Sequence, residues 1–118
     1  MIGNLRNVYR AELRAASAAR TRGDTEAAFG HLARAHILSQ RYTWKHVHVH
    51  VLMLKLGASI GDWREVFGQL SRILAATFFS RIWVPIGNTG RANVSAMQPM
   101  PLPDDLRILL QQSGADSR

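Results

Sequence analysis

The feature that most constrains the fold of this chain is an internal repeat. Residues 23–34 align with residues 61–72 at an offset of 38, and six of the twelve aligned positions carry the same amino acid. Both segments begin with Gly-Asp, in which glycine suits the end of one helix and aspartate caps the start of the next. Asp62 followed three residues later by Glu65 also fits a capping box. A repeated helix–turn–helix unit predicts an all-α protein.

The spacing of apolar residues predicts helices over residues 2–22, 25–41, 44–60 and 63–82, with Thr43 capping the third. We expect two stacked antiparallel helical hairpins, as in a tetratricopeptide-like repeat. A Pro/Gly-rich stretch should run extended, and a short capping helix should follow Pro103 and end at Ser113-Gly114. The chain is predicted to be a single domain, 1–118, with repeat 1 about 2–41, repeat 2 about 44–82, and tail and cap 83–118.

Composition excludes several classes of site. The chain has no cysteine, which excludes disulfides, thiolate zinc sites and iron–sulfur clusters. Its first residues lack the pattern of a signal peptide. The apolar run Val47–Leu54 is interrupted by histidines and too short to span a bilayer. We therefore expect a cytoplasmic protein without a membrane partner.

The net charge of +7 raises the question of an anionic partner. Arg6, Arg10 and Arg14 fall on one face of the first predicted helix, but no aromatic residues alternate with them as a base-stacking platform requires. We expect no nucleic-acid partner, whereas a protein partner stays open; the sequence does not specify the oligomeric state. The turn Gly87–Gly90 lacks the Lys-Ser/Thr ending of a P-loop, so we expect a tight turn there rather than a phosphate site.

Histidines carry most of the functional argument. His46, His48 and His50 alternate with valines, which is typical of a strand, but no second strand candidate exists to pair with them. On a helix, His46 and His50 stand one turn apart on the apolar face with Met53, whereas His48 falls on the polar face. We therefore expect a helix with two buried histidines and one in solvent.

The preceding helix adds two more histidines, His31 and His36, on its packed side. The link to the next helix is short, so the two helices should be antiparallel neighbours. From the rise per residue, His36 and His50 lie level at roughly 10 Å from the link, His46 at roughly 5 Å and His31 at roughly 17 Å. The prediction is that His36, His46 and His50 converge, with His31 just outside or beneath them.

Converging imidazoles in an apolar environment are typical of a metal site. Neutral imidazole is a good ligand for transition metals, and an i, i+4 pair lets one helix chelate an ion. We take His36, His46, His50 and His31 as candidate ligands of a divalent transition metal, zinc or copper. Met53, Met97 and Met100 could add thioether ligands for Cu(I), although a core methionine is more often filler. The alternative is that each histidine is an ordinary core residue bonded to a backbone carbonyl or hydroxyl.

Four stretches together, 31–40, 46–54, 68–72 and 85–95, resemble an uncharacterised bacterial family catalogued as domain of unknown function 3703. By that resemblance His31, His36, His46 and His50 match family motif positions and His48 does not. Ala33 departs from the family pattern, in which we expect an acidic residue at this position. The resemblance implies that the gene of such a protein often lies near heavy-metal resistance genes.

The leading hypothesis is a metal-binding protein of bacterial metal homeostasis, acting as a sensor, buffer or accessory factor. The alternative is a metal-free helical-repeat adaptor that binds a partner protein. An enzyme ranks third, because catalysis is possible only if a three-histidine metal site leaves one coordination position open for water. A nucleic-acid binder ranks last.

Overall fold

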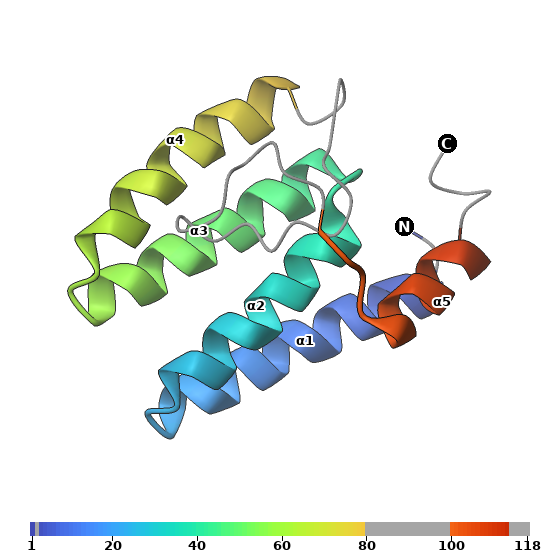
Figure 1. Cartoon of the computed structure of the whole chain (residues 1–118), viewed down its shortest axis with the longest axis horizontal. Coiled ribbons are helices and arrows are strands. Elements are labelled where there is room, and N and C mark those ends of the chain that lie inside the picture. Colours follow the sequence, from blue (N-terminus) through green and yellow to red (C-terminus); the bar gives the residue numbers. More distant parts are fainter. Residues whose placement is uncertain (2, 80–99, 114–118) are drawn as a thin grey trace.

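The structure, a computed structural model, describes residues 1, 3–79 and 100–113. Within these residues the chain forms five helices and no strand: α1 (Gly3–Thr21), α2 (Thr25–Ser39), α3 (Thr43–Ser59), α4 (Trp63–Phe79) and α5 (Asp104–Gln112) (Figure 1). The all-α prediction is confirmed, and the alternating histidine segment is helical. No helix in the described ranges is long and apolar enough to cross a membrane. The predicted turn Gly87–Gly90, Met97 and the end predicted for the fourth helix lie outside the described residues.

The helices pack in sequence order. α1 lies beside α2 and α3 beside α4, each pair running in opposite directions, and α2 contacts α3 between the two pairs (Figure 1). The short helix α5 packs on α2, where Leu106 and Leu109 join the core. This arrangement places one face of α2 against α1 and another against α3, which decides the surroundings of the histidines on α2.

Two turns with the same backbone geometry join the paired helices. Gly23 and Gly61 have φ of 79° and 73°, a region that glycine adopts without steric cost. The next residue in each turn, Asp24 or Asp62, accepts a hydrogen bond of 3.1 Å on its side chain from the backbone N–H three residues on. The prediction that the Gly-Asp pair ends one helix and caps the next is therefore confirmed at both turns.

The start of α3 differs from the prediction. Thr43 is the first helical residue rather than the cap, and Tyr42 occupies the N-cap position in an extended conformation without a side-chain capping bond. The short connection explains the difference, because the helix starts as soon as the chain has turned. The N–H of Tyr42 donates to Ser39 O, which closes the turn, and the C=O of Tyr42 accepts from His46 N, which begins the helix. Both ends of α3 nevertheless lie within one residue of the predicted range.

A close approach between α3 and α4 occurs at Gly57. A Cβ atom at this position would lie 3.1 Å from both Cβ and Cγ of Glu65. The absence of a side chain lets α4 press the Glu65 side chain against α3, and Glu65 is only 2% exposed. A carboxyl group is thereby placed inside the interface between the two helices.

Candidate metal centre

Three imidazole rings meet between α2 and α3. His36 comes from α2 and His46 and His50 from α3, and their side chains are 4%, 8% and 3% exposed. The ring centroids form a nearly equilateral triangle with sides of 4.7, 4.8 and 4.9 Å. The predicted convergence of these three histidines is confirmed.

The rings turn their Nε2 atoms toward one another. His46 Nε2 lies 2.9 Å from His36 Nε2 and 3.1 Å from His50 Nε2, and each of the three histidines offers a nitrogen within 4.8 Å of the others. Zn–N bonds of about 2.0–2.1 Å in a tetrahedral site place nitrogen ligands roughly 3.3–3.4 Å apart. The two contacts of His46 would lengthen by a few tenths of an ångström to reach that spacing, and the His36 and His50 nitrogens lie within 4.8 Å of each other, so small side-chain movements would let the three residues hold a metal ion.

A hydrogen-bonded chain from α4 orients His50. Glu65 Oε2 accepts from Gln69 Nε2 at 2.6 Å, which fixes the Gln69 amide so that Oε1 faces His50 Nδ1 at 2.5 Å. An amide oxygen only accepts, so His50 must carry its hydrogen on Nδ1. Its Nε2 therefore presents a lone pair to the cluster. Carboxylate and carbonyl groups behind an imidazole orient metal-bound histidines in the same way.

No arrangement of hydrogens on neutral rings satisfies His46. If His46 carries its hydrogen on Nε2, that hydrogen serves one neighbour, and the Nδ1 lone pair stays buried. If the hydrogen is on Nδ1, the His46 and His50 lone pairs face each other at 3.1 Å. His46 Nδ1 is buried and has no hydrogen-bond partner among the described residues. A cation at the centre removes the conflict, because it accepts lone pairs from all three rings.

A proton on His46 or His50 is a poor candidate for that cation. Burial and, to a smaller extent, the neighbouring His50 lower the pKa of His46 to about 3. Burial also lowers the pKa of His50, to about 4; the hydrogen bond that His50 donates to Gln69 opposes this shift and the charge of Arg72 adds to it. Both rings are neutral at neutral pH, and neutral imidazole is the form that binds metals.

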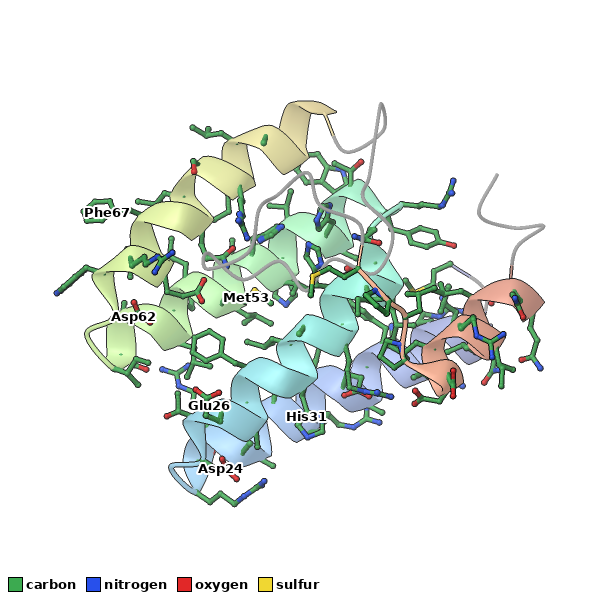
Figure 2. All side chains as sticks on the ribbon, viewed as in Figure 1. Asp24, Glu26, His31, Met53, Asp62 and Phe67 are labelled. Carbon is green, nitrogen blue, oxygen red and sulfur yellow. The ribbon has the colours of Figure 1, made fainter. Side chains whose placement is uncertain are left out.

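The other two histidines lie elsewhere. His31, predicted as a candidate ligand, is not in the cluster: its Nδ1 lies 2.7 Å from Glu12 Oε2 on α1, and Arg34 Nε lies 2.7 Å from the other carboxylate oxygen. The physical reason is that His31 sits on the face of α2 that meets α1 (Figure 2), whereas His36 contacts His46 of α3. His48 is exposed on α3, as the sequence predicts.

The offset of 38 also relates polar pairs across the two halves of the chain. Glu12 and His31 are bonded between α1 and α2, and the equivalent positions, His50 and Gln69, are bonded between α3 and α4. The same cross-helix position thus holds an imidazole–carboxylate pair in the first half and an imidazole–amide pair in the second. Only the second pair adjoins the histidine cluster.

Sequence reasoning missed the supporting residues Glu65 and Gln69. Glu65 is predicted only as part of a capping box, and Gln69 enters the sequence analysis only as the residue that aligns with His31 in the repeat. The available signal is their spacing of four, which places two polar side chains on the face of α4 that meets α3. Met53, a predicted thioether candidate, contacts Gln69 instead, with its Sδ 3.4 Å from Gln69 Nε2.

Comparison with known proteins identifies a family. The family described as protein of unknown function (DUF3703) matches residues 3–110. This match confirms the resemblance carried by the four stretches of sequence. No curated protein and no solved structure matches the chain.

Proposed function

We propose that this chain, which belongs to the DUF3703 family, binds a divalent transition metal ion through His36, His46 and His50. Zinc and copper suit three imidazole nitrogens best. The role we propose is in metal homeostasis in the cytoplasm, as a sensor, buffer or accessory factor. A metal bound between α2 and α3 would join the two halves of the molecule.

The observation that carries this proposal is the meeting of three Nε2 atoms without a satisfactory arrangement of hydrogens. An ordinary core histidine satisfies its nitrogens with backbone or hydroxyl groups. Here His46 directs Nε2 at two other imidazoles and leaves Nδ1 buried without a partner in the described part of the chain. Such a cluster is costly without an ion and becomes favourable with one.

The support from α4 strengthens the case. The buried Glu65 carboxylate acts on His50 through the Gln69 amide and makes the imidazole a better donor to a cation. Arg72 lies close enough to Glu65 for their charges to act on each other, so the carboxyl group also has a basic neighbour.

The test is metal binding by the full chain prepared without a histidine tag. Competition with a chromophoric chelator measures affinity for Zn²⁺, Cu²⁺ and Ni²⁺, and thermal unfolding measures stabilisation by the bound ion. We expect one ion per chain. His50→Ala should abolish binding, whereas His48→Ala, an exposed histidine on the same helix, is the matched control and should bind as the parent does.

Two results would contradict the proposal. One is that the parent binds none of the three ions. The other is that His48→Ala and His50→Ala lose affinity equally, which would assign binding to surface histidines.

A second candidate is an adaptor with tetratricopeptide-like stacked hairpins that binds an acidic partner protein. The observation in its favour is that Arg6, Arg10 and Arg14 are exposed on α1, and none of them forms an ion pair within the described residues. Binding through this face should weaken steeply with salt and should be lost when the three arginines are changed to glutamate. A partner retained by that variant would exclude this form of adaptor.

A further inference from the structure

The outer face of α4 carries a stripe of large apolar side chains. Trp63, Phe67, Leu70 and Leu74 are spaced by four, three and four residues, so they share one side of the helix. They are 61%, 68%, 48% and 64% exposed. Figure 2 shows Phe67 projecting from α4 away from α3. We call these four residues the α4 stripe.

The opposite face of the same helix is already buried. Glu65, Val66 and Gln69 are 2%, 8% and 0% exposed. A helix that is apolar on its outer face as well as packed on its inner face is normally covered on both. Contiguous exposed apolar surface of several hundred Å² on a soluble protein marks an interaction site.

The internal repeat shows what such a face meets in the first half of the chain. Three members of the α4 stripe align at the offset of 38 with Phe29, Leu32 and His36 of α2. Those residues are 1%, 4% and 4% exposed, and α2 is the helix on which the second half of the chain packs. The α4 stripe therefore occupies the position that another helix covers in the first half.

We propose that a second copy of this chain covers the α4 stripe, with α4 packed against α4 about a two-fold axis. A head-to-tail arrangement would instead bring α1 of the next copy onto the stripe, but the exposed side of α1 carries Arg6, Arg10 and Arg14. Outside α4 and the turn before it, the large exposed apolar residues of the described chain are Trp44 and Ile108, each alone on its helix. The apolar surface that best complements the α4 stripe is therefore the α4 stripe of a second copy, as in two-fold dimers.

The area suits a dimer of moderate affinity. A large aromatic side chain buries roughly 150–250 Å² when covered. With the exposed fractions above, the α4 stripe offers on the order of 500 Å² per copy, and two copies bury about 1,000 Å², the lower limit for a specific interface. Two chains of charge +7 also repel each other, so association should strengthen as salt screens the charge. That salt dependence is opposite to the one expected for an acidic partner.

The experiment is sedimentation equilibrium of the full chain over a range of concentrations, with a chelator present so that metal plays no part. We expect a mass that rises from the 13.2 kDa monomer to twice that value. Phe67→Glu should raise the dimer dissociation constant at least tenfold. Ile108→Glu is the matched control, because it introduces the same charge at an exposed apolar residue on α5 and should leave the dimer unchanged.

Single cysteines give an independent measurement, since the chain has none of its own. Leu70→Cys, near the middle of the α4 stripe, should form a disulfide-linked dimer on mild oxidation, whereas Ile108→Cys should not. Circular dichroism of each variant verifies that the helices are intact. A parent that stays monomeric at all concentrations, an assembly larger than a dimer, or equal effects of the two glutamate variants would overturn the proposal. None of these outcomes bears on metal binding, which is tested separately.

Discussion

Acid should destabilise the metal-free protein because of His46 and His50. Burial lowers their pKa values in the folded chain to about 3 and about 4, against 6.5 for an unperturbed histidine. As the pH falls below 6.5, both imidazoles take up protons in the unfolded chain while they stay neutral in the folded one. The unfolded state then binds more protons, and the free energy of unfolding decreases as the pH falls.

The size of this loss follows from the two pKa values. At a pH of about 5, an unfolded imidazole lies roughly 1.5 pH units below its pKa, which is worth about 2 kcal/mol. Each folded imidazole is still neutral there, so the two together remove about 4 kcal/mol relative to pH values above 7. That is a large part of the 5–15 kcal/mol that typically stabilises a domain of this kind.

The assay is urea unfolding followed by circular dichroism, with a chelator present, at several pH values from about 7.5 to about 5. His50→Gln should show about half the pH-dependent loss, and His48→Gln, which changes an exposed histidine, should show the same loss as the parent. A free energy of unfolding that is flat across this range would refute the reasoning. Equal losses in the parent and His50→Gln would assign the effect to other groups.

Two further predictions concern the support behind the cluster. Gln69→Leu should lower metal affinity about 10- to 100-fold in chelator competition without abolishing binding, because His50 loses the group that orients it; affinity equal to that of the parent would contradict the relay through Glu65. The double variant His50→Glu, Gln69→His should place in the second half of the chain the pair that Glu12 and His31 form in the first. We expect it to fold, as judged by circular dichroism; a variant that fails to fold would contradict the equivalence of the two pairs of positions.

Local rules account for what the sequence predicts well. The two turns follow from glycine and aspartate alone, since positive φ and side-chain capping need no distant partner. The convergence of His36, His46 and His50 follows from a short link and a fixed rise per residue, which leave little freedom in depth. These features depend on neighbours in sequence or on helix geometry.

Features that depend on the direction in which the helices pack could not be predicted from the sequence. His31 lies on an apolar arc wide enough to face either α1 or α3, and only the assembled fold selects Glu12 as its partner. Gln69 and Glu65 belong to the site because α4 approaches α3 closely at Gly57. An angular projection of a single helix contains no information on such an approach, so the support of His50 could not be predicted from it.

The pair of equivalent positions, Glu12 with His31 and His50 with Gln69, has a consequence for how such a protein diverges. If the two halves descend from one duplicated hairpin, the first half shows that this cross-helix position tolerates an imidazole–carboxylate pair with no role at the cluster. Exchange of two side chains would then be enough to create or erase the oriented ligand, while both turns and the packing of the helices are retained. Substitution at these two positions would then change whether the third imidazole is present and oriented, without changing the arrangement of the helices.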